Sequence, residues 1–439
     1  MRISVIGCGY LGAVHAASMA KLGHTVTGID VDTRRIDSLA AGEAPFHEPG
    51  FTELLRSSLA SGRLAFSTDM ASAAGHDVHF LCVGTPQAPG SPAADLRYVH
   101  AAIAALTPFL AGSHPTVVAG KSTVPVGTAR ALAKTLRPTS PNAVLVWNPE
   151  FLREGFAVQD TLEPDRIVYG LGDGEAARTG ADVLDRVYAH TLSQGTPKIE
   201  TDYETAELVK VSANSFLATK ISFINGVARV CDATGANVAD LARAIGLDDR
   251  IGKKFLRSGI GFGGGCLPKD LRAFSARATE LGADGLADLL EQVDRINLSQ
   301  RAWVVSLVAQ AVGPDLTGVR IGVLGAAFKP DTDDIRDSPA LAVARALATR
   351  GAHVRVYDPA AGRVLPTDEP GIAVADSADS AVQDASAVLV LTEWDEFAHL
   401  DPTHLAELTA GRLIVDGRGV LDSARWREAG WDYRGLGTR

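Results

Sequence analysis

The sequence is poor in cysteine and contains no long hydrophobic segment. Its four cysteines, Cys8, Cys82, Cys231 and Cys266, are far apart in a chain of 439 residues. Such spacing is not typical of a disulfide framework, and no cysteine–histidine cluster has the spacing of a zinc site. We therefore expect no metal and a reducing, cytoplasmic location. No uninterrupted apolar run reaches the length of a membrane-spanning helix, so we expect no membrane partner.

Positive charge is also scarce. The chain has 42 Lys and Arg residues against 52 Asp and Glu residues, which gives a formal net charge of -10 at pH 7. This balance argues against general binding to nucleic acid or anionic membranes, although it permits local basic pockets for an anionic ligand. A chain of this length exceeds a single hydrophobic core, so we expect two or three domains.

The N-terminal segment has the pattern of a dinucleotide-binding unit. Its apolar residues superficially resemble a signal peptide, but glycines interrupt them. A predicted strand, Arg2–Gly7, leads into a G-x-G-x-x-G turn, which is followed by a helix, a second strand, Thr25–Ile29, and Asp30. Glycines admit a pyrophosphate, the helix N-terminus donates amides to it, and the acid binds ribose hydroxyls while repelling a ribose phosphate. The pattern therefore favours NAD over NADP, with a tight turn that binds no ligand as the alternative.

Polar side chains follow three further predicted strands, Val78–Val83, Thr116–Ala119 and Val144–Trp147. Ligands of open parallel sheets bind beyond the carboxyl ends of the strands, so these side chains are candidates for a site. Ser122 and Thr123 can instead cap a helix, and Arg35 can be a solvated helix charge. The candidates in this first domain are Gly7, Gly9, Tyr10, Leu11, Gly12, Asp30, Arg35, Thr85, Ser122, Thr123, Glu150 and Glu154.

The C-terminal part repeats the first pattern with a different ligand site. The segment 349–358 matches 21–30 in pattern, and predicted strands lie at Val319–Leu324, Ala387–Leu391 and Arg412–Val415. This repeat predicts a second Rossmann-like domain. It lacks the glycine turn and instead has cations beyond its strands, which indicate an anionic ligand held by charge or, alternatively, surface charges in acidic loops. These cations are Lys329, Arg336 and Arg418.

The segment between the two domains is predicted to be helical. Residues from Tyr203 to about Ala233 have apolar spacing typical of one long helix. Lys210 and Asn214 are four residues apart and therefore share a face, although a snorkelling lysine and a solvated asparagine are the alternative. The fold class is thus α/β, with two Rossmann-like doubly wound domains joined by a central helical, dimerising region. The predicted domains are 1–200, 201–312 and 313–439.

Glycines cluster around one cysteine in Gly261–Asp270. Glycine is costly in backbone entropy, so such a cluster indicates that the backbone passes close to something. Cys266 is followed by Pro268, Lys269 and Asp270, which predicts a thiol in an exposed, polar turn beside a cation. A thiolate in such surroundings is a nucleophile. The alternative is a buried, inert cysteine.

Together these motifs resemble the UDP-glucose/GDP-mannose dehydrogenase family over nearly the whole chain. Two segments, Pro164–Val168 and Arg250–Leu256, are most similar to its UDP-glucose branch. The other marks are the glycine turn, Lys121–Gly127, Asn148–Glu154, Lys210 with Asn214, the glycine–cysteine motif, Phe328–Pro330 and Asp416–Arg418.

The resemblance implies an NAD-dependent, four-electron oxidation of a sugar primary alcohol to a carboxylate. Cys266 would add to the intermediate aldehyde, and a thioester would then be hydrolysed. It implies that Lys210 and Asn214 stabilise the oxyanion and that Thr123, Glu150 and Asp270 handle protons. Lys269 and Arg336 would contact the cofactor. The implied substrate-binding residues are Glu150, Phe151, Leu152, Glu154, Lys210, Asn214, Arg250, Phe255, Phe262, Gly263, Phe328, Lys329 and Arg418, with Arg250 coming from a neighbouring subunit of a homodimer or larger homo-oligomer.

Alternatives remain open at this point. The same chemistry can act on GDP-mannose or UDP-N-acetylmannosamine, because those enzymes share the scaffold. A two-electron hydroxyacid dehydrogenase would not require the cysteine. A non-catalytic NAD-binding regulator would show no turnover with any nucleotide sugar.

Overall fold

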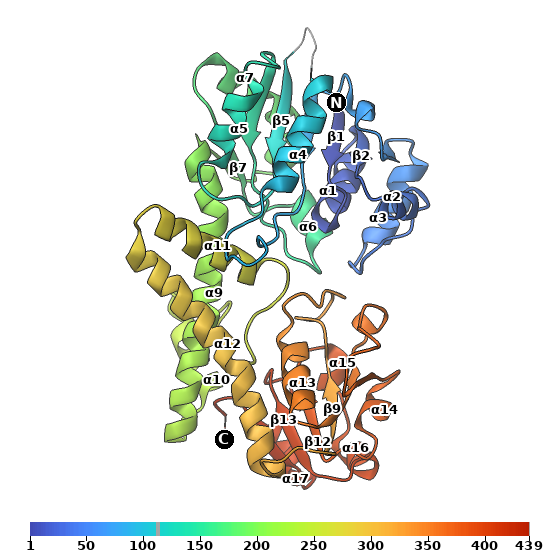
Figure 1. Ribbon diagram of the computed structural model, residues 1–439, viewed down its shortest axis with the longest axis vertical. Coiled ribbons are helices and arrows are strands. Elements are labelled where there is room, and N and C mark those ends of the chain that lie inside the picture. Colours follow the sequence, from blue (N-terminus) through green and yellow to red (C-terminus); the bar gives the residue numbers. More distant parts are fainter. Residues whose placement is uncertain (111–114, 439) are drawn as a thin grey trace. The chain divides into compact units, whose positions relative to one another are not determined.

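The computed structural model describes residues 1–110 and 115–438. The chain divides into two compact units, Met1–Ala213 and Asn214–Arg439, and each contains one mainly parallel sheet with helices around it (Figure 1). This architecture confirms the α/β fold class with two Rossmann-like sheets. The finer division into 1–200, 201–312 and 313–439 stays a prediction.

The sheet of the first unit has the strand order β3-β2-β1-β4-β5-β6-β7-β8. All pairings are parallel except β6 with β7. Inner strands such as β5 are buried along their full length, which explains their continuous apolar sequence. The strands are β1 (Arg2–Ile6), β2 (Thr25–Ile29), β3 (Leu64–Ser67), β4 (Val78–Leu81), β5 (Thr116–Gly120), β6 (Ala143–Trp147), β7 (Ile167–Leu171) and β8 (Lys198–Asp202).

Helices cover both faces of this sheet. One hydrophobic core includes residues of α1, α3 and α7, and another includes residues of α4, α5 and the start of α9. The helices are α1 (Tyr10–Lys21), α2 (Thr33–Ala40), α3 (Phe51–Ala60), α4 (Arg97–Leu106), α5 (Thr128–Leu136), α6 (Ala157–Leu162), α7 (Glu175–Val187), α8 (Ala189–Ser193) and the first part of α9 (Tyr203–Thr234). The chain reverses its winding between β1 and β4, which is where an open α/β sheet binds its ligand.

The second unit contains an entirely parallel sheet in the order β11-β10-β9-β12-β13-β14. This order repeats that of the first six strands of the other sheet, which bears out the internal repeat seen in the sequence. The strands are β9 (Arg320–Leu324), β10 (His353–Tyr357), β11 (Ile372–Val374), β12 (Ala387–Val390), β13 (Leu413–Asp416) and β14 (Asp432–Gly435). For every strand predicted from the sequence, the observed first and last residues lie within two positions of the predicted ones.

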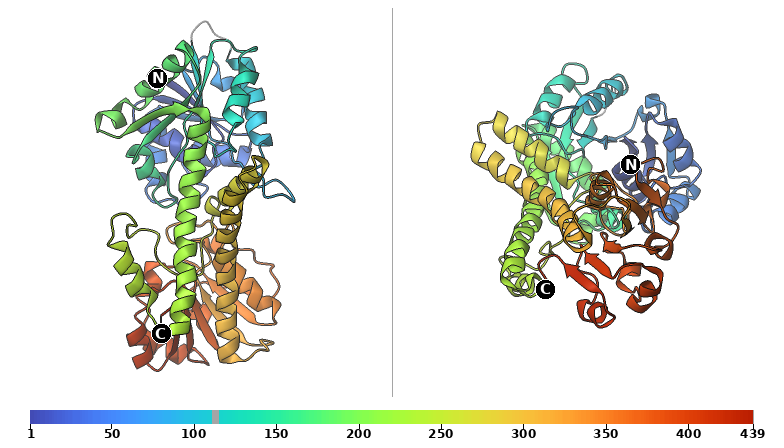
Figure 2. Two further views of the ribbon diagram at one scale, coloured as in Figure 1. Left: turned by 90° about the vertical axis from the view of Figure 1, so that its left-hand side faces the viewer. Right: turned by 60° about the horizontal axis from the view of Figure 1, so that its bottom comes forward.

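Figure 2 shows the two long helices α9 and α12 (Asp284–Val312). Within the second unit they are joined where Ser222 Oγ donates to the Val293 carbonyl at 2.8 Å. The remaining helices are α10 (Val238–Gly246), α11 (Leu267–Glu280), α13 (Pro339–Thr349), α14 (Ala378–Val382), α15 (Asp395–Ala398), α16 (Pro402–Leu408) and α17 (Ser423–Glu428). Among the described residues, no helix is both long and apolar enough to cross a membrane.

Candidate active site

The glycine turn of the first unit fits a dinucleotide. Gly7 adopts a positive φ of 90°, and a Cβ there would lie 2.9 Å from the Val83 Cα. A Cβ on Gly12 would lie 1.8 Å from the Gly7 carbonyl oxygen, so both positions require glycine. Gly9 precedes α1, and a Cβ at this position would meet no other atom within 4 Å. The backbone is therefore exposed to a pyrophosphate at the helix N-terminus, where Tyr10 and Leu11 begin α1.

Asp30 lies directly after β2 and is hydrogen-bonded to the glycine turn. Its Oδ2 accepts from the Cys8 amide at 2.7 Å, and its Oδ1 accepts from the Asp32 amide at 3.0 Å. Arg35 donates to Asp30 Oδ2 at 2.9 Å, so its guanidinium is not a solvated helix charge. The carboxylate and the glycine turn are held together, as binding of a ribose beside a pyrophosphate requires.

The ends of β4 and β5 are joined by hydroxyl groups. Thr85 Oγ1 donates to the Thr123 carbonyl at 2.7 Å, and Ser122 Oγ donates to the Val83 carbonyl at 2.7 Å. Capping by Ser122 or Thr123, the alternative in the sequence, is wrong because α5 begins only at Thr128, with Gly127 at its N-cap. The hydroxyls instead fix the strand ends that border the dinucleotide turn.

A buried ion pair lies beyond β6. Lys210 Nζ, from α9, is 3.0 Å from Glu150 Oε1, and the two side chains are only 6% and 13% exposed. Glu150 Oε2 also accepts from the Leu152 amide at 2.7 Å, so the carboxylate is held at both oxygens. The Phe151 ring lies 5.7 Å from Lys210 Nζ and 3.9 Å from the guanidinium carbon of Arg166. Lys210 is thus not a snorkelling lysine.

Glu207 is a further buried carboxylate close to Lys210 in the sequence of α9, and no sequence motif pointed to it. It lies on α9, three residues before Lys210, and its side chain is buried. Its carboxylate accepts from the Gly127 amide at 2.7 Å and the Ala129 amide at 2.6 Å. These bonds tie α9 to the start of α5. The sequence signal was an acid about one turn before Lys210, on the same face of the predicted helix.

Lys121 is a second buried cation beside the pair. Its Nζ lies 3.5 Å from the Asn148 carbonyl oxygen, and 5.6 and 5.8 Å from the ring centroids of Phe80 and Tyr188. Burial lowers the pKa of Lys121 to about 8, against the opposing effects of Cys82 and Glu150, while Lys210 lowers it further. The positive charge of Lys121 is therefore costly in the folded state.

In the second unit, Asn214 and Asp270 form the corresponding polar pair. Asn214 Nδ2 donates to Asp270 Oδ2 at 2.7 Å, and Lys269 Nζ lies 2.5 Å from Asp270 Oδ1. Asp270 is buried, so Asn214 is not merely a solvated residue of α9. Asp270 lies in the first turn of α11, where its amide donates to the Cys266 carbonyl at 3.0 Å, and Asn214 comes from α9.

Cys266 is exposed and occupies the N-cap position of α11. This placement agrees with the predicted polar turn and disagrees with a buried, inert thiol. Cys8, Cys82 and Cys231 are buried, and none of the four forms a disulfide. The 14-residue helix directs its positive end toward position 266, which favours an anionic sulfur there.

The glycines before Cys266 let the backbone approach another part of the protein. Much of the space that side chains would occupy at these positions is filled by the protein itself. A Cβ on Gly263 would lie 2.5 Å from the Asp337 carbonyl oxygen, and one on Gly264 would lie 2.8 Å from the Phe328 ring. A Cβ on Gly265 would lie 2.3 Å from the guanidinium carbon of Arg336. Glycine lets this segment pack on the loop after β9.

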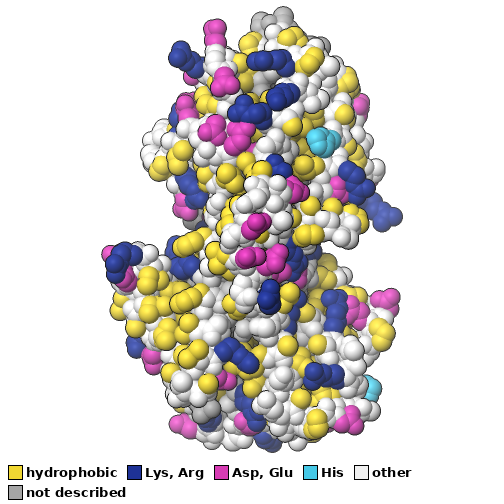
Figure 3. Space-filling view, turned by 60° about the vertical axis from the view of Figure 1, so that its left-hand side comes forward, with side chains coloured by type: hydrophobic (Ala, Val, Ile, Leu, Met, Phe, Trp, Pro, Cys, Tyr) yellow, Lys and Arg dark blue, Asp and Glu magenta, His cyan; other side chains and the backbone are white. Residues whose placement is uncertain are grey.

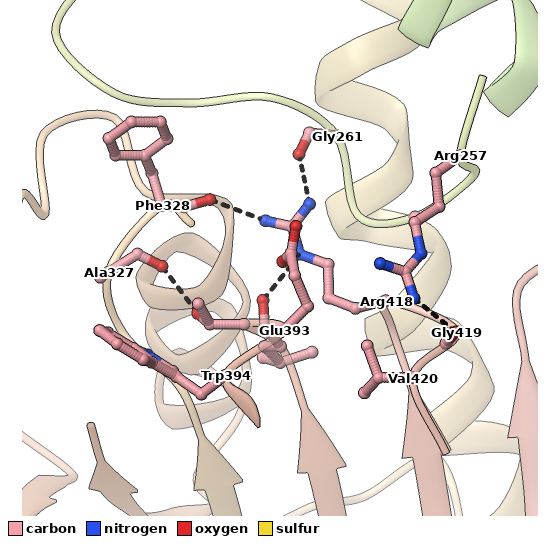
Figure 4. A network of polar contacts seen from close by, with 12 residues as sticks. Arg257, Gly261, Ala327, Phe328, Glu393, Trp394, Arg418, Gly419 and Val420 are labelled. Atoms are coloured by element: carbon pink, nitrogen blue, oxygen red, sulfur yellow. Dashed lines mark hydrogen bonds and ion pairs between the residues drawn. The ribbon is translucent and has the colours of Figure 1, made fainter. Parts of the chain in front are cut away.

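Arg418 binds three different segments of the second unit (Figure 4). Its guanidinium donates at 3.0 Å to the carbonyls of Leu391, Gly261 and Phe328, and its Nε lies 3.2 Å from Glu393 Oε2. The side chain is 11% exposed, so it is not a surface charge. It fixes the glycine–cysteine segment and the Phe328 loop to the ends of β12 and β13.

The other predicted ligand residues of this unit differ in exposure. Lys329 Nζ lies 5.7 Å from the ring centroid of Phe328, and exposed Arg336 pairs with Asp334 at 2.7 Å. Arg250 pairs with Asp248 at 2.6 Å with 89% of its side chain exposed, and Phe255 is 38% exposed. Phe262 is buried, and its amide donates to Asn297 Oδ1 at 2.8 Å. Within residues 1–110 and 115–438, no group of three or more His, Cys, Asp or Glu side chains is placed to hold a metal.

The sheets and their strand-end residues place the chain among dinucleotide-dependent dehydrogenases, and comparison with known proteins specifies the family. Residues 1–192 match the NAD binding domain of the UDP-glucose/GDP-mannose dehydrogenase family, 204–299 its central domain and 322–423 its UDP binding domain. The chain belongs to this family, and NAD is its cofactor.

Relatives resemble the chain over its full length. A UDP-glucose 6-dehydrogenase of Rhizobium meliloti (strain 1021) is 42% identical over 100% of this chain and 99% of its own length. The structure of a UDP-glucose dehydrogenase from Pyrobaculum islandicum is 38% identical with a TM-score of 0.90, covering 100% of this chain and 98% of that one. A UDP-D-ManNAc dehydrogenase structure from Pyrococcus horikoshii is 27% identical with a TM-score of 0.86, covering 100% and 99%.

The buried lysine generates a testable pH dependence. Between pH 8 and 10.5 the unfolded chain keeps the Lys121 proton that the folded chain releases, so folding stability rises with pH there. Below pH 8 the folded chain carries the full free-energy cost of the buried Lys121 charge. Relative to Lys121→Met, the wild type should gain about 2 kcal/mol of unfolding free energy between pH 7.5 and 10. Urea unfolding at several pH values measures this difference.

Lys121→Arg is the matched control for the charge. Its guanidinium stays protonated throughout this range, so it should lack the gain just as the Met variant does. Parallel pH profiles for the wild type and both variants would contradict a depressed Lys121 pKa.

Proposed function

We propose that this protein oxidises UDP-glucose to UDP-glucuronate with NAD. The observation that carries the proposal is the 42% identity, over the full length of both chains, to a UDP-glucose 6-dehydrogenase. Identity is lower, at 27%, to the UDP-D-ManNAc dehydrogenase structure. Two buried or half-buried polar pairs, Glu150–Lys210 and Asn214–Asp270, and the exposed Cys266 supply the residue types that the chemistry needs.

Oxidation of an aldehyde requires a tetrahedral adduct, and Cys266 is the residue that we expect to form it. In our proposal the primary alcohol first loses a hydride and a proton to become an aldehyde. The Cys266 sulfur then bonds to the aldehyde carbon, and the thiol proton passes to the oxygen, which gives a thiohemiacetal. Loss of a second hydride and proton gives a thioester, and water cleaves the carbon–sulfur bond to release the carboxylate and the thiol.

The charged pairs suit the groups formed along this path. Lys210 offers a cation and Asn214 an amide donor to an oxyanion, while Glu150 and Asp270 are carboxylates that can hold or accept protons from the alcohol or water. Thr123, which follows β5, completes this set with a hydroxyl. The Leu152 amide holds Glu150, and Glu207 fixes α9, which carries Lys210, to the start of α5, so both groups are oriented before substrate arrives.

The proposed cofactor site is the turn of the first unit. Bound NAD supplies the acceptor for each of the two hydrides. The open backbone at Gly9 and the helix N-terminus bind the pyrophosphate, and Asp30 binds the adenosine ribose, assisted by Arg35. The other proposed contacts are Gly7, Tyr10, Leu11, Gly12, Thr85, Ser122, Thr123, Glu154, Lys269 and Arg336.

We propose contacts with the nucleotide sugar residue by residue, as the family resemblance implies them. Phe151, Leu152 and Glu154 would contact it from the first unit. Phe255, Phe262, Gly263, Phe328, Lys329 and Arg418 would contribute from the second. Because Arg418 already binds three carbonyls, its main proposed role is to hold the loops that form the nucleotide site. We divide these functions among the domains 1–200, 201–312 and 313–439.

We further propose a homodimer formed through the central helices. Phe216, Phe223 and Val230 are spaced by seven residues on α9, so they form one stripe, and they are 67%, 57% and 61% exposed. Figure 3, which views the side of the central helices, shows hydrophobic side chains at the surface. The highly exposed Arg250 suits a contact with the substrate of a neighbouring subunit.

We place this activity in the cytoplasm, where it would make sugar acids for polysaccharides. Sparse, widely spaced cysteines are typical of proteins from reducing compartments. A reducing compartment also protects an exposed nucleophilic cysteine, because oxidation would consume the thiol.

A nucleotide-sugar panel tests the substrate. UDP-glucose should give two NADH per sugar, whereas GDP-mannose and UDP-N-acetylmannosamine should give none at the same concentration. Absorbance at the NADH band measures the yield. Turnover of another sugar without turnover of UDP-glucose would refute the substrate assignment, and a flat trace with every sugar would indicate a regulator that only binds NAD.

A cysteine substitution tests the mechanism. Cys266→Ala should lower the rate of UDP-glucuronate formation by roughly 10⁴-fold, because the aldehyde can no longer form a sulfur adduct. The matched control is Cys231→Ala, at a buried cysteine of α9, which should retain the wild-type rate. Mass spectrometry of the sugar product distinguishes the acid from the aldehyde. If Cys266→Ala still completed two oxidations per sugar, the thioester would be excluded.

Charge on the exposed stripe tests the dimer. Phe216→Asp combined with Phe223→Asp should halve the mass measured by light scattering, because two carboxylates would be buried in the interface. Val364→Asp, at a residue of the second unit that is 45% exposed, is the control and should leave the mass unchanged. A wild-type monomer, or a variant that keeps the wild-type mass, would exclude this interface.

A further inference from the structure

Glu48 forms a buried connection that neither the motifs nor the proposed mechanism uses. It lies between α2 and α3 and is only 6% exposed. Its Oε2 accepts from the Tyr10 hydroxyl in a short hydrogen bond and from the Gly155 amide at 2.7 Å. Its Oε1 accepts from the Ala157 amide at 2.7 Å. One carboxylate therefore binds both Tyr10 and Gly155, which are 145 positions apart in the sequence.

The first end of this connection is the dinucleotide turn. Tyr10 follows Gly9 directly and is the first residue of α1, so its backbone lies where the pyrophosphate would bind. Its ring centroid lies 4.7 Å from that of Phe46, and this packing limits its rotation. Burial and the Glu48 carboxylate raise the pKa of Tyr10, so the hydroxyl keeps its proton and remains the donor.

The second end is the segment that carries Glu150 and Glu154. Gly155 has a positive φ of 82°, and its amide also points to the Tyr10 hydroxyl at 3.1 Å. Ala157 begins α6. The segment has other bonds as well: the Leu152 amide donates to Glu150, Arg153 donates to Asp160, and Glu150 pairs with Lys210 of α9. The Glu48 carboxylate thus joins the dinucleotide turn to the catalytic segment through charge-assisted bonds, which are the stronger kind.

We propose that Glu48 is a positioning residue that couples dinucleotide binding at the glycine turn to the arrangement of Glu150 and Glu154 through the Tyr10 hydroxyl. This inference rests on the proposed function, since it assumes that those carboxylates meet the sugar nucleotide. A dinucleotide that settles on the Gly9–Tyr10 backbone fixes Tyr10, and Glu48 transmits that position to Gly155. By linkage, dinucleotide and sugar nucleotide then strengthen each other's binding by the same factor.

The consequence matters because the reaction needs two dinucleotides per sugar. The spent dinucleotide must leave and a fresh one must bind while the sugar stays in place. A connection between turn and segment allows the catalytic carboxylates to relax between the two oxidations and to return to position when the second dinucleotide binds. A segment without such a connection would keep one arrangement throughout.

Calorimetry with the full-length enzyme tests the coupling. The dissociation constant of UDP-glucose is measured alone and with saturating NADH, which cannot accept a hydride. In the wild type we expect NADH to tighten UDP-glucose binding at least about threefold. Tyr10→Phe removes only the hydroxyl and keeps the ring on Phe46, and it should bring this ratio close to one while both ligands still bind.

Two further variants separate coupling from folding. Glu48→Gln keeps the size of the side chain but removes its charge. The folded variant should also show a reduced ratio of the two UDP-glucose dissociation constants. Tyr98→Phe, at a 53% exposed tyrosine of α4, is the matched control and should keep the wild-type ratio. A wild-type ratio of one, or a Tyr10→Phe ratio equal to that of the wild type, would overturn the coupling. Failure of UDP-glucose to bind under any condition would instead refute the proposed substrate.

Discussion

The ion pair between Glu150 and Lys210 is the interaction on which the proposed catalytic part of the first unit depends. It joins the end of β6 to α9, and both side chains are largely withdrawn from water. A buried pair is only stable when its geometry is fixed, because removing either partner leaves an uncompensated charge. The chain meets this requirement twice: Glu207 ties α9 to α5, and Asn148, bonded to Tyr188 and to the Val168 carbonyl, holds the strand end.

Buried carboxylates recur as the means by which loops are fixed at the strand ends. Asp416 is the fullest case: it accepts from the amides of Arg418, Gly419, Val420 and Leu421 and from the Tyr433 hydroxyl. Burial raises the pKa of Asp416 although these donors oppose the shift. A loop that must present its backbone or a cation to an anionic ligand cannot be held by apolar packing alone. Amide-to-carboxylate bonds give it a defined shape and leave the opposite surface open.

Local pattern predicted the strands, the glycine turn, α9 and the exposed cysteine, because each depends on residues close together in the sequence. It could not predict partners that meet only in the folded chain. Glu48 and Glu207 look like ordinary acids in the sequence, since their amide donors lie 107 and 80 residues away. The sequence showed the glycines before Cys266 but not why glycine is needed there. Phe328 and Arg336, which fill the adjoining space, come from a distant loop that follows β9. The sequence likewise identified Arg418 as a cation but could not identify the three carbonyls that it binds.

The two sheets share the geometry of the turn after their first strand, and they differ in the partners of one aspartate. Gly7 and Gly325 both have a positive φ, and the next amide, of Cys8 or Ala326, donates at 2.7 Å to an aspartate at the end of the neighbouring strand. In the first sheet the aspartate, Asp30, also accepts from the Asp32 amide and from the side chain of Arg35, which is 34% exposed. In the second, Asp358 is held by the Trp394 indole at 3.1 Å and by the amides of Ala327, Ala360 and Ala361. Both oxygens of Asp358 are therefore engaged by the fold itself, so this carboxylate is less available to a ribose than that of Asp30.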